Sequence, residues 1–198
     1  PLGKEQARHL GEYLVRHDIA FDEAYTGPLH RQRDTGAIVA WSFHSAGRAF
    51  PEVQVLDGLM EFSAEPMAMK FFPRLVEENA QVREWLTQFQ AAPDVAEKSR
   101  YFQKAFEVLL AKWADGIYRD DAILPWTGFV AKVNEALRFM TADKPKGRRI
   151  IAFTSGGVTA VALHRALDTS ADVTTRLAWM LRNGALTEFL FTNGRFTL

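Results

Sequence analysis

The segment from Arg148 to Leu163 constrains the fold more than any other part of this sequence. An apolar run at residues 150–153 follows two arginines and ends at a Ser-Gly-Gly break. Because the run is short and contains β-branched residues, it favours a buried strand over a helix. Apolar side chains then recur at helical spacing, at Val158, Val161, Ala162 and Ala166. The segment therefore predicts a strand, a tight turn and a helix.

The turn of this segment is a candidate anion site. Thr154, Ser155, Gly156 and Gly157 lie where the turn leads into the helix. Free backbone N–H groups and the positive end of the helix dipole converge there, and glycines let a ligand approach the backbone. Many α/β proteins have a glycine-containing turn that binds nothing, so the turn alone leaves both interpretations open. It is neither a dinucleotide fingerprint, which needs Gly-x-Gly-x-x-Gly, nor a nucleotide P-loop, which needs Gly-Lys-Ser/Thr.

The composition limits the class of protein. A length of 198 residues allows one domain with a subdomain or lid, and 47% hydrophobic residues are enough for a large core. The 24 basic and 24 acidic residues cancel, so nothing argues for a nucleic-acid or membrane partner. The absence of cysteine excludes disulfides and fits a reducing compartment. We find no signal peptide and no apolar run of about 20 residues, and therefore expect a cytoplasmic location.

In the rest of the chain, predicted strands and helices also alternate. Further strands are predicted at residues 21–25, 53–55, 185–191 and 195–198, the last two joined by an Asn193-Gly194 hairpin turn. A helix is predicted from Leu29 to about Ser42, and Arg31 falls in its first turn, where a guanidinium could face an anion at the strand ends. The pattern predicts an α/β protein of three layers, α/β/α, with a mainly parallel sheet and an antiparallel edge strand.

Residues 65–118 differ in character from the rest, because methionine and aromatic residues recur there at helical spacing. Phe102, Phe106 and Trp113 form one such stripe. A stripe of this kind is more often a core than a ligand pocket. We therefore predict a helical insertion packed beside the sheet, and expect it to act as a lid over the site.

Five stretches, in order, resemble motifs of the histidine phosphatase superfamily, also called the phosphoglycerate mutase-like fold. Residues 1–7 (PLGKEQA) are similar to its first-helix motif, T/S-x-x-G-x-x-Q-A. Residues 21–35 (FDEAYTGPLHRQRDT) are similar to F-D-x-V-Y-S-S-P-L-x-R-A-x-x-T. Residues 59–61 (LME) resemble L-x-E, residues 150–158 occupy the place of V-V-S-H-G-G-V, and residues 183–187 (NGALT) resemble N-x-S-V-T. The order and spacing agree along nearly the whole chain.

The resemblance implies a phosphoryl-transfer site at the carboxyl ends of the parallel strands. In this family a histidine of an Arg-His-Gly motif on the first strand takes the phosphoryl group, and water then releases it. Two arginines and a second histidine bind the phosphate, while a carboxylic acid protonates the leaving oxygen. Such chemistry depends mainly on positioning and positive electrostatics, and a guanidinium supplies a planar fork of donors for it.

Three residues match the family's working positions. Arg31 matches the phosphate-binding arginine, although Gln32 follows it where alanine is usual. Glu61 matches the proton donor of L-x-E, and Thr35 would be a supporting structural residue. Without the resemblance, Arg31 would be interpreted as a surface arginine and Glu61 as an exposed acid after a turn.

The sequence departs from the family at two histidines. No Arg-His-Gly occurs, so we expect the first strand and its nucleophile to lie upstream of Pro1. Ser155 stands at the position of the second histidine, and it keeps a hydrogen-bond donor but loses the imidazolium charge. His30 and His164 are candidates to compensate. We predict that Arg31, Ser155 and Gly156 bind phosphate.

These observations lead to a main hypothesis and two alternatives. The main one is a phosphohistidine-type phosphatase that hydrolyses a small phosphomonoester, with no cofactor or metal; the five histidines show no metal-ligand spacing. The first alternative is a degenerate relative that binds a phosphorylated ligand or a protein partner without turnover, which Ser155 motivates. The second is mutase-like phosphoryl transfer, although the charged loops that a mutase needs are not recognisable.

Overall fold

A computed structural model describes residues 2–192 and 195–198 of the chain. These residues form two compact units. The first contains Pro1–Glu61, Val130–Thr169 and Leu177–Leu198, and the second contains Phe62–Phe129 and Ser170–Arg176. No helix within the described ranges is both long and apolar enough to cross a bilayer.

The first unit is built on a three-stranded parallel sheet. Its strands are β1 (Glu23–Thr26), β2 (Val53–Val55) and β3 (Ile150–Phe153), in the order β2-β1-β3. Thr26 lies opposite Phe153 in the pairing of β1 with β3. Because both pairings are parallel, all three strands end at the same edge of the sheet.

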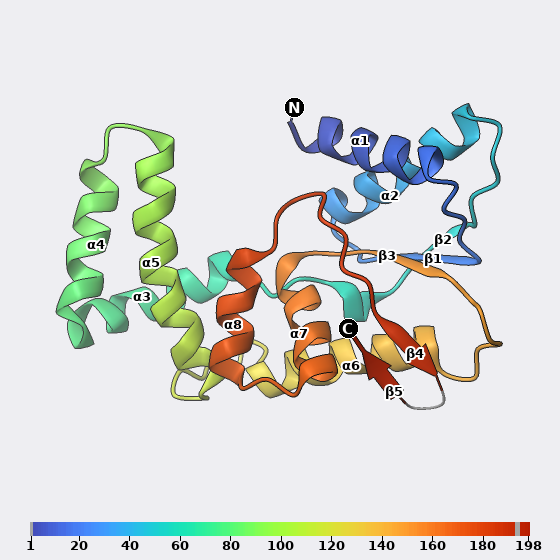
Figure 1. Cartoon of the computed structure of the whole chain (residues 1–198). Coiled ribbons are helices and arrows are strands. Elements are labelled where there is room, and N and C mark those ends of the chain that lie inside the picture. The colour runs from blue at the N-terminus through green and yellow to red at the C-terminus, as the bar shows by residue number, and fades with distance from the viewer. Residues whose placement is uncertain (1, 193–194) are drawn as a thin grey trace. The chain divides into compact units, whose positions relative to one another are not determined.

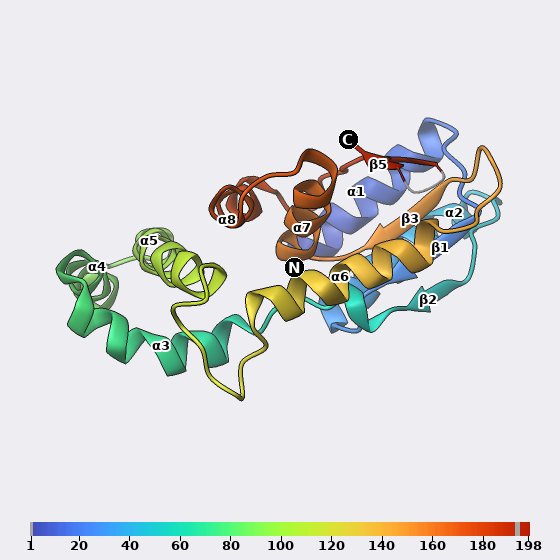
Figure 2. The same ribbon diagram turned by 90° about the horizontal axis from the view of Figure 1, so that it is seen from below.

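Helices cover both faces of this sheet, as Figures 1 and 2 show. α1 (Leu2–Arg16) and α2 (His30–Ser45) lie on one face. α6 (Trp126–Thr141) and α7 (Gly156–Leu167) lie on the other. The predicted three-layer α/β/α arrangement is therefore confirmed. The antiparallel edge strand predicted for this sheet is wrong within the described residues, because both pairings in the sheet are parallel and the antiparallel strands form a separate sheet.

Successive side chains of a strand point to opposite faces of the sheet, and this explains how a core forms on each face. One core cluster joins the first face of the sheet to α1 and α2, and its buried members are Leu14, Ala24, Val39, Phe43, Ile151 and Phe153. Tyr25 follows Ala24 and points to the opposite face, where its ring centroid lies 6.1 Å from that of Phe139 on α6. The central strand β1 is therefore buried on both sides, as is usual in a parallel sheet, whereas the edge strand β2 exposes Gln54 and Val55.

The predicted strands at residues 53–55 and 150–153 are confirmed, and the first strand begins two residues later and ends one residue later than predicted. The prediction of a strand over residues 185–191 is wrong for most of its length. Only β4 (Leu190–Thr192) forms there, and it pairs antiparallel with β5 (Arg195–Thr197) in a separate two-stranded sheet. β5 pairs with three residues of β4. The residues before Leu190 therefore have no neighbouring strand, among the described residues, to which their backbone groups could hydrogen-bond. The predicted Asn193-Gly194 turn lies outside the described residues.

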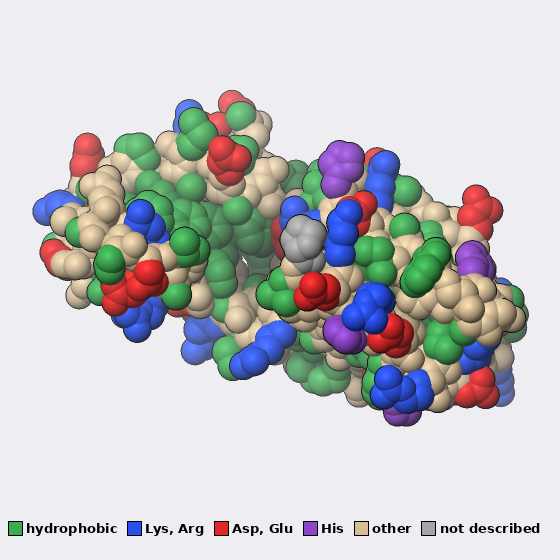
Figure 3. Space-filling model, turned by 90° about the horizontal axis from the view of Figure 1, so that it is seen from above, with side chains coloured by type: hydrophobic (Ala, Val, Ile, Leu, Met, Phe, Trp, Pro, Cys, Tyr) green, Lys and Arg blue, Asp and Glu red, His purple; other side chains and the backbone are tan. Residues whose placement is uncertain are grey.

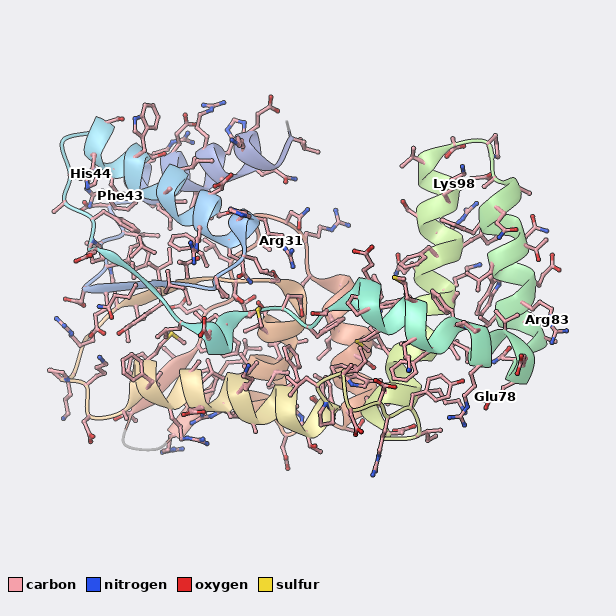
Figure 4. All side chains as sticks on the ribbon, turned by 180° about the vertical axis from the view of Figure 1, so that it is seen from behind. Arg31, Phe43, His44, Glu78, Arg83 and Lys98 are labelled. Atoms are coloured by element: carbon pink, nitrogen blue, oxygen red, sulfur yellow. The ribbon has the colours of Figure 1, made fainter. Side chains whose placement is uncertain are left out.

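The second unit is helical and has its own core. It contains α3 (Ala64–Glu78), α4 (Ala80–Ala91), α5 (Val95–Ala114), the start of α6 and the first residues of α8 (Ala171–Met180). Part of the predicted methionine and aromatic stripe is core, with buried members Met67, Phe71, Phe106 and Trp113, whereas Met69 is exposed. Tyr118 donates to Glu78 over 2.9 Å, and the Arg74 guanidinium lies 4.7 Å from the Tyr118 ring centroid. Figure 4 shows Glu78 in this unit.

The outward face of α1 and α2 carries mixed charge. Acidic and basic side chains are interspersed over it, as Figure 3 shows. Arg8 pairs with Glu12, and Lys4 pairs with Asp34 at 3.8 Å. Among the described residues of this face neither sign forms a continuous field, in keeping with the zero net charge of the chain.

An ion-pair cluster joins β1 to the loop before β3, at the edge where the strands begin. Glu23 accepts hydrogen bonds from Lys144 over 2.7 Å, from Arg148 over 3.2 Å and from the Tyr25 hydroxyl over 2.5 Å. The bond from Lys144, followed by that from Tyr25, holds the pKa of Glu23 below its ordinary value. Burial and the bond to Glu23 raise the pKa of Tyr25 to about 12. The cluster therefore ties two distant segments together through a charged, largely buried carboxylate.

We expect Glu23→Gln to lower the free energy of unfolding by about 1–3 kcal/mol near neutral pH, because it removes the charge that Lys144 and Arg148 contact. The pKa of Glu23 is lowered in the folded protein, so this stabilisation is present above the ordinary glutamate pKa. It is lost as the pH falls through the folded-state value. Urea unfolding measured against pH should therefore show the gap between natural protein and variant closing in acid.

The matched control is Glu52→Gln, since Glu52 is exposed and forms no ion pair with any described residue. It should unfold like the natural protein. Equal unfolding curves for Glu23→Gln and the natural protein near neutral pH would contradict the proposed contribution of the cluster.

Candidate anion-binding site

Three segments meet at the edge where the parallel strands end. The Gly27 N–H donates to the Phe153 carbonyl over 3.0 Å, and the Leu56 N–H donates to the Thr26 carbonyl over 2.8 Å. The Thr154 hydroxyl donates to the Leu59 carbonyl over 2.9 Å. The residues after β1, β2 and β3 are thus held against one another, and the predicted turn lies among them.

The N-terminus of α7 is capped by a carboxylate from another segment. Ser155 is the N-cap residue, with extended backbone angles (φ −117°, ψ 171°), but its side chain makes no capping hydrogen bond. Glu61 Oε2 instead accepts from the Gly157 N–H over 2.8 Å. A negative side chain at this end of a helix is stabilised by the helix dipole. Glu61 therefore already occupies part of the space and one of the donors that an anionic ligand would use.

Gln32 connects all three segments through one side chain. Its Nε2 donates to the Leu59 carbonyl and to Ser155 Oγ, each over 2.9 Å, and its Oε1 accepts from the Leu29 N–H over 3.2 Å. The side chain is 2% exposed. Gln32 also takes the position, three residues past the N-cap, from which a side chain reaches back to the helix start. Its place three residues after Leu29 is therefore a signal in the sequence for this bond, although in the family motif Gln32 is only a departure from alanine.

Arg31 precedes Gln32 in the first turn of α2, and its side chain is exposed. Figure 4 shows it at the N-terminal end of that helix. The Thr35 hydroxyl donates to the Arg31 carbonyl over 2.8 Å and supports this turn. The guanidinium makes no hydrogen bond or ion pair with any residue in the described ranges, so its donors are available to a ligand.

The structure brings most of the predicted site residues to one corner. Ser155, Gly156 and Glu61 meet at the start of α7, and the hydrogen bond from the Gln32 side chain to Ser155 brings the first turn of α2, which includes Arg31, next to them. His164 was a candidate to compensate for the missing histidine, and this prediction is wrong. It lies nine residues beyond Ser155 on α7, about 13 Å along the axis, and its Nδ1 contacts the Thr169 carbonyl at 2.6 Å. His30 is exposed in the first turn of α2, and its role stays a prediction.

The arrangement offers donors for an oxyanion rather than ligands for a metal. Within residues 2–192 and 195–198, no group of three or more histidine and acidic side chains is placed to hold a metal ion. The corner instead combines the first N–H groups of a helix, a serine hydroxyl and a carboxylate. Such groups can bind a phosphoryl group and transfer a proton.

Comparison with known proteins defines the class. The sequence profile of the histidine phosphatase superfamily (branch 1) matches residues 1–124 of the 198, and the chain belongs to this superfamily. No curated protein matches the sequence. Seven chains of known structure match. One is a crystal structure from Escherichia coli K-12, named there as a proposed alpha-ribazole-5'-P phosphatase. It is 17% identical, with a TM-score of 0.54 over 87% of this chain and 68% of that one, and so shows the fold.

The fold and the family agree with the resemblance found in the sequence. The phosphoglycerate mutase-like fold is confirmed, and membership of the superfamily supports a phosphatase or another phosphoryl-transfer enzyme.

We expect Gly27→Ala to destabilise the corner by about 1–3 kcal/mol, because it overpacks a filled space. A Cβ at Gly27 would lie 2.0 Å from Gln32 Oε1 and 2.5 Å from the Leu59 carbonyl oxygen. The control is Gly3→Ala, where a Cβ meets nothing within 4 Å and a helical alanine is neutral or slightly stabilising. Thermal unfolding of the two variants compares them. Equal midpoints would show that the three segments are not packed this closely.

Proposed function

We propose that this protein hydrolyses a small phosphomonoester through a phosphohistidine intermediate. Arg31, Ser155 and Gly156 bind the phosphoryl oxygens, and Glu61 acts as the proton donor. The observation that supports this most is the corner itself, where the Ser155 hydroxyl and the start of α7 lie beside the first turn of α2, whose Arg31 guanidinium pairs with no described residue. The superfamily match supports the same class of reaction.

The proposed first step breaks the bond between phosphorus and the leaving oxygen while a histidine nitrogen bonds to phosphorus. The negative charge on the phosphoryl oxygens is stabilised by the Arg31 guanidinium, the Ser155 hydroxyl and the N–H groups of α7. A proton from Glu61 neutralises the leaving oxygen. Water then attacks phosphorus, releases inorganic phosphate and restores the histidine.

In this proposal Glu61 also exchanges with the phosphoryl group at the N-terminus of α7. Without substrate its carboxylate accepts from the Gly157 N–H. An incoming phosphoryl group competes for that same donor, and a protonated Glu61 gives it up more readily because it has lost its charge. The exchange of one anion for another would bring the acid and the phosphoryl group to the same helix start.

The nucleophilic histidine of this proposal is not among residues 1–198. The sequence holds no Arg-His-Gly, and we propose that a histidine upstream of Pro1 takes the phosphoryl group. The prediction that residues 65–118 act as a lid also remains a proposal.

A second candidate function is phosphate recognition without turnover. Ser155 supports it, because a neutral hydroxyl stands where the family has a second histidine. In that case the natural full-length protein would bind inorganic phosphate but leave aryl phosphates and metabolite phosphates intact. Mutase-like transfer is a third candidate, which a bisphosphate requirement would reveal.

The proposal is tested by assaying the natural full-length protein together with Arg31→Ala. We expect turnover of small phosphomonoesters by the natural protein, and a fall of about 10²- to 10³-fold in kcat/KM for the variant, because a donor to the developing charge is lost. Arg33→Ala is the control, since Arg33 is an exposed arginine two residues further along the same helix, and it should keep full activity. Absence of turnover by the natural protein across a broad panel, or equal loss in both variants, would overturn the proposal.

The role of Glu61 is tested by Glu61→Gln. The amide oxygen can still accept from the Gly157 N–H, so the fold should survive while the transferable proton is lost. We expect about a 10²-fold loss or more with alkyl phosphates. The loss should be far smaller with an aryl phosphate, whose acidic phenol needs little help to leave. Equal losses with both substrates would argue against a proton-donor role, and Glu52→Gln serves as the exposed control.

A further inference from the structure

Two of the positions at which this sequence departs from the family motifs contact each other. Gln32 stands where alanine is usual, and Ser155 stands where the second histidine is usual. They are 123 residues apart in the chain, yet Gln32 Nε2 lies 2.9 Å from Ser155 Oγ. A contact between the two unusual residues indicates one rearranged unit rather than two independent losses.

The direction of this hydrogen bond is fixed by the other partners of Gln32. The Leu59 carbonyl can only accept, and it lies 2.9 Å from Nε2. The Leu29 N–H can only donate, and it lies 3.2 Å from Oε1. The amide therefore cannot be turned around without breaking both bonds. Nε2 must donate to Ser155, so Ser155 Oγ accepts and its own hydroxyl proton points elsewhere.

No described residue accepts a hydrogen bond from that hydroxyl, and the Ser155 side chain does not cap α7. The proton is therefore held on a half-buried serine at the start of a helix, beside Gly156. A phosphoryl oxygen at the proposed site would be a suitable acceptor, since hydrogen bonds to charged groups are the stronger ones.

We propose that Gln32 is a positioning residue, which holds the Ser155 hydroxyl as a donor to the phosphoryl group. The pair then supplies one O–H donor in place of the N–H donor that the imidazole would provide, without the positive charge of the imidazolium. This inference rests on the proposed function, because it assumes that a phosphoryl group binds here. Burial of Gln32 at 2% exposure keeps water from competing for its donors.

If Gln32 had only a structural role, it would stabilise the fold without affecting the binding of phosphate. The two roles separate in a double-mutant cycle on the full-length protein with Gln32→Met, Ser155→Ala and the double variant. Methionine preserves length and removes both donors. Gln54→Met on the exposed side of β2 is the control for the change of residue type. The probe is inorganic phosphate, measured by calorimetry, with unfolding by urea recorded for each variant.

We expect each single variant to bind phosphate on the order of tenfold more weakly. The double variant should bind no more weakly than Ser155→Ala, because Gln32 acts on phosphate only through that hydroxyl. Gln32→Met should lower stability in both backgrounds, since the contacts with Leu29 and Leu59 are lost in both. Gln54→Met should change neither quantity.

Three outcomes would overturn the positioning role of Gln32, and one of them would overturn the proposed function as well. If the natural protein does not bind phosphate, the proposed function fails and this inference with it. If it binds phosphate but Gln32→Met is as tight as the natural protein, the proposed function stands and the positioning role is overturned. Fully additive losses in the double variant overturn it as well.

A second measurement leaves Gln32 unchanged, in case Gln32→Met does not fold. The side-chain NH2 signals of Gln32 can be followed by ¹⁵N NMR in the natural protein and in Ser155→Ala. Phosphate should shift them in the natural protein and have little effect in the variant. Signals that do not move at saturating phosphate in the natural protein would overturn the inference.

Discussion

The site depends on the parallel pairing of β1 with β3. Thr26 lies opposite Phe153, and the Gly27 N–H continues the ladder by donating to the Phe153 carbonyl over 3.0 Å. This register brings the start of α2 next to the start of α7, although the two helices begin more than 120 residues apart. A shift of one residue would reverse the facing of every side chain on the strand. It would also separate Gln32 from Ser155, so the polar corner and the two apolar cores rely on the same register.

The polar corner is held by neutral and singly charged groups rather than by a cluster of cations. The Gln32 amide uses both of its Nε2 protons and its oxygen, and Glu61 neutralises the positive end of the α7 dipole. A buried amide has no charge to desolvate, whereas a buried imidazolium would need a partner. The network is therefore stable without a ligand. Arg31, at the start of α2, pairs with no residue in the described ranges and is therefore a cation that a ligand can use.

The sequence predicted the layers of the fold well and the contacts of the site poorly. The strand at residues 150–153 was correct in both bounds because a β-branched run ends there at turn residues. The prediction of a strand at residues 185–191 was mostly wrong, because a strand forms only where a neighbouring strand supplies backbone hydrogen bonds. Arg31, Glu61 and Ser155 were selected by local motifs, but the bonds from Gln32 to Ser155 and from Gly157 to Glu61 span 123 and 96 residues. Local periodicity carries no information about such distant partners.

A crystal structure of the natural full-length protein with vanadate would show whether this corner binds a phosphoryl group, since vanadate imitates one. We expect vanadate oxygens within hydrogen-bond distance of the Ser155 hydroxyl, the Gly156 N–H and the Arg31 guanidinium, with Glu61 displaced from the Gly157 N–H. Vanadate bound at another place, with Glu61 still accepting from Gly157 and Arg31 in solvent, would contradict this expectation.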